Sequence, residues 1–195
     1  MTEVIILAAG ESSRLGFPKQ TLLYRGKTLL ELAVEAGIKS KCSEVMVVLG
    51  ASAKTIEMGI QHYGVNILVN PNWTDGMASS IIWGLNSFKD KTGIDNAVIM
   101  LCDQPFVSSF IIDKLIDKHQ ETNKKIIACE YDKTIGVPAL FDRSVFPELL
   151  LLKGQEGAKK ILAKYPDDVA TIPFETGSVD IDTISDYQAF LNTFK

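Results

Sequence analysis

The first twenty residues carry the side chains best suited to binding a polyphosphate. Three small residues, Ala8, Ala9 and Gly10, follow a short apolar run and leave room for a ligand against backbone N–H groups. Arg14 and Lys19 come next in a polar loop. A forked guanidinium and a compact ammonium both bind phosphate oxygens through charge-assisted hydrogen bonds. We expect a nucleotide site here, while the composition also allows a surface turn with both side chains solvated.

A second reactive side chain follows the apolar run at residues 97–101. Asp103 stands there in the tetrapeptide Cys-Asp-Gln-Pro, with no basic residue close by in sequence. A carboxylate at the carboxyl end of a central strand suits a bound cation. The alternative is that Asp103 caps a helix beginning near Ser108. The neighbouring Cys102 is expected to be a buried thiol without a catalytic role, because no histidine or cationic residue accompanies it.

Two further segments could complete the site. A turn-forming stretch ending at Gly76 runs into a helical pattern with Ser79 and Ser80 in its first turn, and free N–H groups at a helix start favour an anion. An ordinary helix cap explains the same pattern. Near the carboxyl end, Asp180 and Asp182 stand two apart on a predicted strand over residues 178–182 and so share a face. Asp180 is our first choice to join Asp103 in a metal site, and for Asp182 we favour capping the last helix.

Hydrophobic patterning predicts the elements that position these residues. Short buried strands alternate with helices in a βαβαβ order, which implies right-handed crossovers and a mostly parallel sheet. A T-x-x-E capping box marks the first helix, and a late strand pair flanks a polar turn, with one member possible in the antiparallel direction. The predicted strands cover residues 4–7, 44–49, 65–69, 97–101, 125–131 and 138–141, and the first two helices cover residues 29–38 and 52–61.

Bulk properties restrict the class of protein. The 195 residues and 46% hydrophobic content are enough for one α/β domain over residues 1–195. A net charge of −4 with scattered lysines argues against nucleic-acid and membrane-surface partners. No apolar run approaches about 20 residues and no leader pattern opens the chain, so we expect a cytoplasmic protein. Three cysteines without a paired spacing indicate reduced thiols.

The first loop also resembles a known signature. The residues L-A-A-G-E-S-S-R-L-G-F-P-K-Q-T-L-L are similar to L-A-A-G-x-S-x-R-[ML]-G-x-x-K-x-L-L, found in nucleotidyltransferases related to the molybdenum-cofactor cytidylyltransferases. The resemblance implies a three-layer α/β/α fold with a mostly parallel mixed sheet, similar to the nucleotide-diphospho-sugar transferases. It also implies that Arg14 and Lys19 hold phosphates and that the backbone of Ala8 to Gly10 reads the base, with Leu7 as a further nucleotide-binding residue.

The resemblance extends along the chain. A segment similar to N-x-x-[WY]-x-x-G-[ML]-x-x-S implies nucleotide contacts for Gly76, Ser79 and Ser80. The D-Q-P tripeptide implies that Asp103 holds magnesium, and a D-[IV]-[DN]-T segment implies a second magnesium ligand at Asp180. Two departures from the family pattern, Val137 in place of histidine and Gln155 in place of aspartate, lie on the acceptor side.

These observations predict transfer of CMP from CTP to a molybdenum-cofactor-like phosphate, with Mg²⁺ and with release of pyrophosphate. CTP is favoured over GTP because guanylyl-transferring relatives tend to read L-A-G-G where Ala9 stands here. Methylerythritol phosphate or another small phosphate is the rival acceptor. An alternative of another class is an inactive nucleotide-binding or cofactor-binding accessory protein that has kept the fold.

Overall fold

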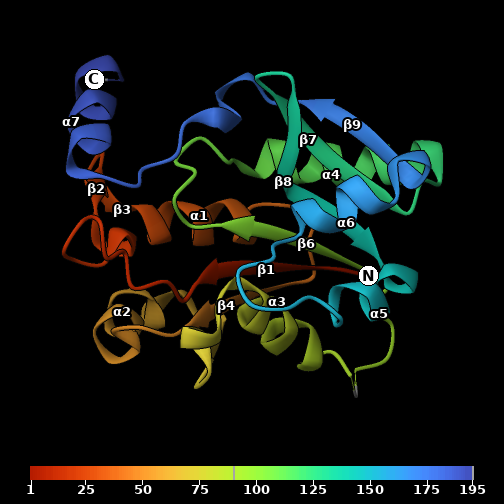
Figure 1. Cartoon of the computed structure of the whole chain (residues 1–195), viewed down its shortest axis with the longest axis horizontal. Coiled ribbons are helices and arrows are strands. Elements are labelled where there is room, and N and C mark those ends of the chain that lie inside the picture. The colour runs from red at the N-terminus through yellow and green to blue at the C-terminus, as the bar shows by residue number, and fades with distance from the viewer. Residues whose placement is uncertain (90, 195) are drawn as a thin grey trace.

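Over residues 1–89 and 91–194, the part of the chain described by the computed structural model, the fold is built on a seven-stranded sheet (Figure 1). The strand order is β5-β4-β1-β6-β8-β7-β9. The strands are β1 (Thr2–Ala8), β4 (Glu44–Leu49), β5 (Asn66–Val69), β6 (Asn96–Leu101), β7 (Ile126–Tyr131), β8 (Thr134–Asp142) and β9 (Val169–Pro173). The helices are α1 (Leu29–Ile38), α2 (Ala53–Ile60), α3 (Met77–Asn86), α4 (Ser109–Thr122), α5 (Phe146–Leu149), α6 (Lys159–Lys164) and α7 (Ile184–Thr193).

The strand β1 occupies the middle of the parallel part of the sheet. It pairs with β4 on one side and β6 on the other, both in parallel. Every residue of β1 is buried, including the polar Thr2 and Glu3 at its start, and its apolar run from Val4 to Ala8 is typical of a strand covered on both faces. Leu7 lies opposite Leu101 in this register. The carboxyl ends of β1 and β6 therefore lie side by side, and the loops that follow them meet at one edge of the sheet.

One strand runs against the others. β8 is antiparallel to both β6 and β7, whereas β9 is parallel to β7. In the predicted strand pair at residues 125–131 and 138–141, the antiparallel member is β8. This strand starts at Thr134 and not at residue 138, because Thr134 already pairs with Tyr131. The sheet is mixed but mostly parallel, as the sequence predicted.

Helices cover both faces of the sheet. Alternate side chains of β1 point to opposite sides, with Val4 and Ile6 in one buried cluster and Ile5 and Leu7 in the other. The first cluster receives α1, α2 and α4, and the second receives α3, α5 and α6. This confirms the predicted three-layer α/β/α fold. Among the described residues, none of the helices combines the length and apolarity needed to span a membrane.

The carboxyl-terminal segment forms a third cluster beside the first loop. Helix α7 packs against the small hairpin of β2 (Leu23–Tyr24) and β3 (Lys27–Thr28), where Leu22, Tyr24, Ile181 and Phe190 are buried together (Figure 1). The predicted strand over residues 178–182 is wrong. The last strand is β9, and the chain then leaves the sheet edge through a short 3-10 turn and an irregular stretch toward the hairpin, burying Ile181 there.

Helix α1 carries a half-buried charge, Glu35, whose pH dependence can be measured. Its predicted capping box between Thr28 and Glu31 is confirmed. Further along, Glu35 accepts hydrogen bonds from Lys27, from Lys39 at 2.7 Å and from the Tyr63 hydroxyl at 2.9 Å. These partners lower the pKa of Glu35 to about 2, with the Lys27 hydrogen bond as the largest cause. A lowered carboxylate pKa stabilises the fold above the unfolded-state pKa, and this stability is lost as the pH falls toward 2.

We therefore expect Glu35→Gln to lower the free energy of unfolding by about 1–2 kcal/mol at pH 7, a modest value because both lysines are partly exposed and screened. The difference from the unmodified protein should shrink as the pH falls below about 4.5 and close near pH 2. Urea unfolding across this range measures it. Asp117→Asn, which removes an exposed ion pair with Lys41, is the matched control and should change stability little. A Glu35→Gln effect independent of pH would contradict the assignment.

Candidate nucleotide site

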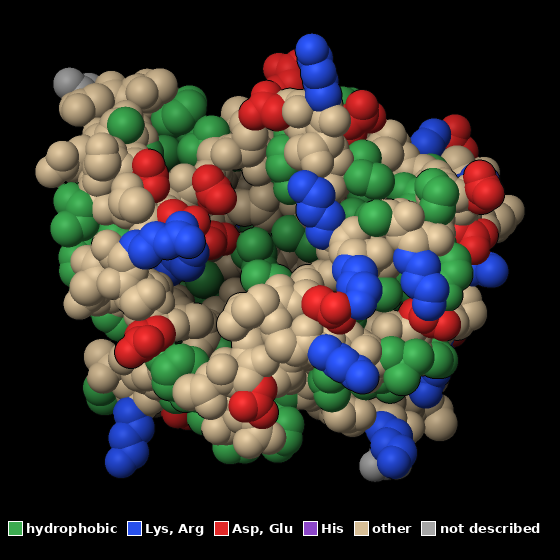
Figure 2. Space-filling view, in the orientation of Figure 1, with side chains coloured by type: hydrophobic (Ala, Val, Ile, Leu, Met, Phe, Trp, Pro, Cys, Tyr) green, Lys and Arg blue, Asp and Glu red, His purple; other side chains and the backbone are tan. Residues whose placement is uncertain are grey.

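A cleft of about 510 Å³ opens at the carboxyl ends of β1 and β6. Figure 2 shows a hollow on this face beside a group of acidic and basic side chains. Four parts of the chain line the cleft: the end of β1 with its loop, the start of α3 with the turn before it, the end of β6 with its loop, and Gln155. The lining residues are 7–13, 19, 20, 73, 74, 76, 77, 80, 101–103 and 155.

Most residues predicted for the site line this cleft. They are Leu7, Ala8, Ala9, Gly10, Lys19, Gly76, Ser80 and Asp103, whereas Arg14, Ser79 and Asp180 lie outside its lining. The Ser79 hydroxyl instead donates to the carbonyls of Asn72 and Gly76, both at 2.8 Å. Those bonds close the turn before α3, so Ser79 shapes the cleft wall from behind.

The start of α3 is less open to an anion than its sequence indicated. The Ala78 N–H donates to the Gly154 carbonyl at 3.1 Å, and the Ser79 N–H donates to the Gly76 carbonyl at 3.2 Å. Two of the N–H groups expected to be free are therefore occupied. The segment that carries Gly154 and Gln155 thus closes one side of the cleft, a contact that sequence spacing could not show.

The contact with Gly154 makes Gly76 intolerant of a side chain. Gly76 has φ of 101°, and a Cβ there would lie 2.4 Å from the Gly154 oxygen. We expect Gly76→Ala to displace the Gly154 segment and to lower both thermal stability and nucleotide affinity, with a stability cost of about 1–3 kcal/mol. Gly59→Ala is the control, because Gly59 lies within α2 and a Cβ there meets nothing within 4 Å. Equal melting temperatures and affinities for the two variants would refute this prediction.

Lys19 lies between two carboxylates. Its Nζ is 2.5 Å from Asp103 Oδ2 and 2.9 Å from Asp182 Oδ1, and only 18% of its side chain is exposed. Burial alone lowers the pKa of Lys19, but the charges and hydrogen bonds of Asp103 and Asp182 outweigh it and raise the pKa above its ordinary value. Lys19 is a fixed positive charge at the cleft.

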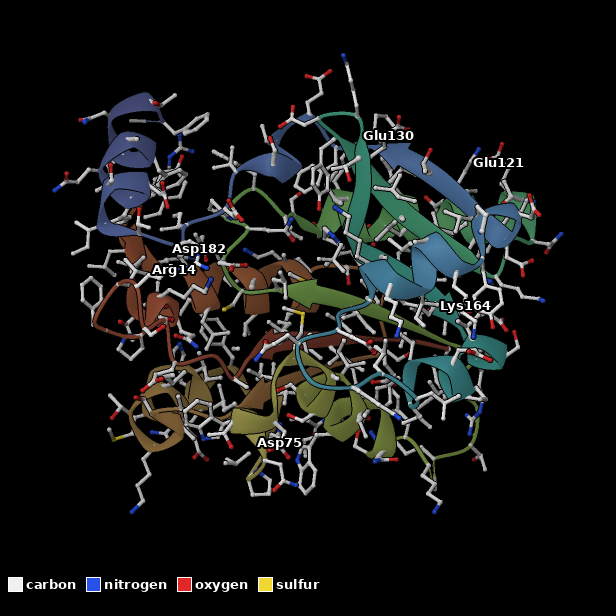
Figure 3. All side chains as sticks on the ribbon, viewed as in Figure 1. Arg14, Asp75, Glu121, Glu130, Lys164 and Asp182 are labelled. Carbon is white, nitrogen blue, oxygen red and sulfur yellow. The ribbon has the colours of Figure 1, made fainter. Side chains whose placement is uncertain are left out.

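Asp182 also holds the second cationic side chain of the loop. Arg14 NH1 donates to Asp182 Oδ2 at 3.3 Å, and Figure 3 shows the two side chains close together beside the cleft. The Arg14 side chain is 73% exposed. The predicted capping role of Asp182 is wrong: Thr183 caps α7 and forms a capping box with Asp186. Asp182 instead links the carboxyl-terminal segment to both basic residues of the first loop.

Asp103 and Asp180 have properties that suit a cation, but they do not belong to a cluster of three metal-binding side chains among the described residues. Asp103 Oδ1 is buried and has no hydrogen-bond partner among the described residues. Burial and the negative charges of Asp182 and Asp103 raise the pKa of Asp180. Nowhere in the described residues do three His, Cys, Asp or Glu side chains converge as a metal site. The Asp103 oxygen that faces Lys19 is occupied by an ammonium group instead.

The sequence did not identify Gln20, whose side chain packs against the Ala8–Gly10 turn. Its side chain is 1% exposed, and its Nε2 donates to the carbonyl oxygens of Ala8 at 2.7 Å and Gly10 at 3.1 Å. Next to it, the Lys19 N–H donates to Ser12 Oγ at 3.1 Å. These bonds tie the two ends of the loop together. The one sequence feature that points to Gln20 as a site residue is its position next to Lys19.

Two of the thiols, Cys102 and Cys129, are buried. Burial is the main cause that raises the pKa of Cys102 to about 12 and that of Cys129 likewise to about 12. Both thiols are therefore protonated at neutral pH. Cys102 lines the cleft as a small buried neighbour of Asp103, as predicted from its surroundings in sequence.

A mostly parallel sheet with a cleft of about 510 Å³ and charged residues at its strand ends is the arrangement in which open α/β proteins bind ligands. Residues 4–169 match the MobA-like NTP transferase domain, and the chain belongs to this family of nucleotidyltransferases. Nicotine blue oxidoreductase of Paenarthrobacter nicotinovorans is 31% identical over 191 residues, covering 92% of this chain and 91% of that protein. Purine catabolism protein PucB of Bacillus subtilis strain 168 is 26% identical over 165 residues, and the match covers 81% of this chain and 78% of PucB.

Solved structures show the same fold over nearly the whole chain. Rv0371c from Mycobacterium tuberculosis H37Rv superposes with a TM-score of 0.84 at 29% identity, covering 98% of this chain and 97% of that chain. The structure of Rv0371c in complex with manganese gives a TM-score of 0.82 at 27% identity and covers 98% of each chain. The segment that contains Asp180 and Asp182 lies beyond the family match but within this structural similarity.

Proposed function

We propose that this chain transfers CMP from CTP to a phosphate of a molybdenum-cofactor-like acceptor. The observation that supports it best is the convergence of Lys19 and Asp103 at a cleft floored by the small residues Ala8 to Gly10. An acceptor phosphate oxygen forms a bond to the α-phosphorus of the triphosphate. The bond from that phosphorus to the β-phosphate oxygen breaks, and pyrophosphate leaves. This chemistry depends on positioning and charge more than on a protein nucleophile.

The cationic side chains have separate tasks in this proposal. Lys19, mostly buried and held by two carboxylates, presents a positive charge at a fixed place in the cleft. Arg14 is exposed and pairs with Asp182 outside the cleft lining, and in this proposal it closes on the outer phosphates. The backbone of Ala8, Ala9 and Gly10 lies against the base. Asp182 orients both cations toward the same ligand.

The residues present fit a divalent cation. Asp103 offers a buried carboxylate oxygen without a partner, and Asp180 offers a second carboxylate whose charge is disfavoured by its neighbours. Hard carboxylate oxygens are the donors that Mg²⁺ prefers, and the manganese complex of Rv0371c supports a divalent ion in such a protein. Bound there, Mg²⁺ would neutralise charge on the triphosphate. In this proposal Asp103 and Asp180 hold it.

We place the acceptor near Val137 and Gln155, the two positions at which the chain departs from the family pattern. The Val137 carbonyl accepts hydrogen bonds from Gln104 Nε2 at 3.1 Å and from the Tyr131 hydroxyl at 3.2 Å. β8 is thereby tied to the loop that carries Asp103. Gln155 lines the cleft. In this proposal the acceptor binds near these two segments, where the Val137 side chain offers no hydrogen bond and Gln155 carries no charge.

The test is to supply CTP and Mg²⁺ with each acceptor separately and to detect the cytidylylated product by mass and pyrophosphate by a coupled assay. Product with the molybdenum cofactor supports the proposal. Product with methylerythritol phosphate alone would overturn the acceptor and leave nucleotidyl transfer intact. Nucleotide binding without turnover for any acceptor would favour the accessory-protein alternative.

A second candidate is an oxidoreductase, favoured by the 31% identity to nicotine blue oxidoreductase over 92% of this chain. The same cleft would then bind a dinucleotide cofactor instead of a triphosphate. One assay separates the two candidates. An oxidoreductase would oxidise a reduced nicotinamide dinucleotide in the presence of nicotine blue, and it would release no pyrophosphate. Cofactor oxidation without pyrophosphate release from any triphosphate would replace the first candidate with the second.

The base preference gives a prediction at Ala9. Ala9 is buried and lines the cleft, so its methyl group takes space beside the base. We expect CTP to be used in preference to GTP, and Ala9→Gly to reduce that preference by about tenfold, because removing one methyl group changes discrimination by about 1–3 kcal/mol. Specificity constants for both triphosphates measure the change. A preference for GTP in the unmodified protein would refute the cytidylyl assignment.

A further inference from the structure

Gln20 is a buried amide with one half of its hydrogen-bonding capacity unused. Both bonds that it makes come from Nε2, which donates to the carbonyl oxygens of Ala8 and Gly10. Its Oε1 is buried and has no partner within residues 1–89 and 91–194. A buried acceptor without a donor is costly, so Oε1 keeps a hydrogen-bonding capacity that a ligand group in the adjoining cleft can complete.

The orientation of this amide is fixed by its neighbours. A flipped amide would place Oε1 against two carbonyl oxygens, where no hydrogen bond could form. Oε1 is therefore held as an acceptor at a residue that lines the cleft beside Ala8, Ala9 and Gly10. A phosphate oxygen is excluded as its partner, because it too is an acceptor at neutral pH. The partner that Oε1 lacks is therefore an N–H or O–H donor, and a nucleoside bound in the cleft offers such groups.

We infer that Gln20 is a specificity-determining residue whose Oε1 accepts a hydrogen bond from the exocyclic amino group of the base. This inference rests on the proposed cytidylyl transfer and deepens it. Cytosine carries an amino group at its 4-position, where uracil carries a carbonyl oxygen that would face Oε1 as a second acceptor. An amino group also projects beyond the ring, so it reaches a recessed acceptor while the ring lies against the small turn. Gln20 thus separates CTP from UTP, and Ala9 separates pyrimidine from purine.

The first experiment uses the unmodified protein and needs no variant. Isothermal titration with Mg²⁺ compares CTP, UTP, dCTP and the ribonucleoside triphosphate of 2-pyrimidinone, which has hydrogen at the 4-position. We expect CTP to bind at least tenfold more tightly than UTP, equivalent to about 1.4 kcal/mol, with the pyrimidinone nucleotide weaker than CTP and dCTP close to CTP. Equal affinities for CTP and UTP would overturn the inference. A loss confined to dCTP would also overturn it, by assigning the donor to the ribose.

Variants then locate the effect. Gln20→Met should bring the ratio of CTP to UTP affinity close to one. Gln104→Met is the matched control, because Gln104 is also buried, also donates through Nε2 to two carbonyls and also has an unpaired Oε1, yet it does not line the cleft. It should keep the preference for CTP.

The outcomes of these titrations are distinct. An unchanged CTP preference in Gln20→Met, or an equal loss in both variants, would overturn the inference. If Gln20→Met does not fold, the comparison of nucleotides on the unmodified protein decides alone. Binding of no triphosphate at all would instead reject the proposed function itself, together with this inference.

Discussion

Replacing Asp103 with asparagine is expected to lower turnover with CTP at least about a hundredfold, because one preorganised electrostatic contact contributes about two to three orders of magnitude in rate. Asp103 carries a buried, unpartnered oxygen and also binds Lys19, so the change removes a charge that two groups depend on. Asparagine keeps the shape of the side chain. Initial rates of pyrophosphate release with a saturating acceptor measure the effect.

Two comparisons make this result specific to the cleft. Asp117→Asn, on the exposed side of α4, should leave the rate unchanged, because its carboxylate pairs with Lys41 and does not line the cleft. Binding of Mn²⁺ to the protein without nucleotide should also weaken in Asp103→Asn. Near-normal turnover in Asp103→Asn would remove Asp103 from the catalytic proposal, whatever the metal titration shows.

The central fold could be predicted from the sequence because its strands are buried on both faces. The strands β1, β4 and β6 are short runs of apolar residues, and such runs are typical of the middle of a parallel sheet. The segment at residues 178–182 misled the prediction, because its alternation of aspartate with valine and isoleucine imitates a half-buried strand. There the packing of one side chain, Ile181, against the hairpin decides the path of the chain.

The site could be predicted only in part, for a similar reason. Lys19 and Asp103 meet because parallel strands end at one edge of the sheet, a rule that sequence order reveals. The contact between Arg14 and Asp182 spans 168 residues and depends on how α7 packs, which no local pattern encodes. The same holds for the Gly154 carbonyl at the start of α3. Contacts set by irregular segments lie outside what periodicity and spacing can predict.

Lys19→Met is expected to lower turnover about a hundredfold or more, with a pattern that differs from Asp103→Asn. The variant loses the fixed positive charge at the cleft, so its affinity for CTP should fall together with its rate. Its carboxylate partners remain, however, and they lose the ammonium that neutralised them. Mn²⁺ should therefore bind to Lys19→Met without nucleotide at least as tightly as to the unmodified protein.

The melting temperature of Lys19→Met provides a second, independent test. Removing one member of a mostly buried ion pair leaves an uncompensated charge on Asp103, so the melting temperature should fall in metal-free buffer. Added Mn²⁺ should recover more of this loss in Lys19→Met than in Asp103→Asn, since a ligand that binds the folded state stabilises it according to its affinity. Lys41→Met, which breaks an exposed pair, is the control and should show neither effect. If Lys19→Met kept full turnover, or bound Mn²⁺ more weakly than Asp103→Asn, Lys19 would not be the counterion of the cleft carboxylates.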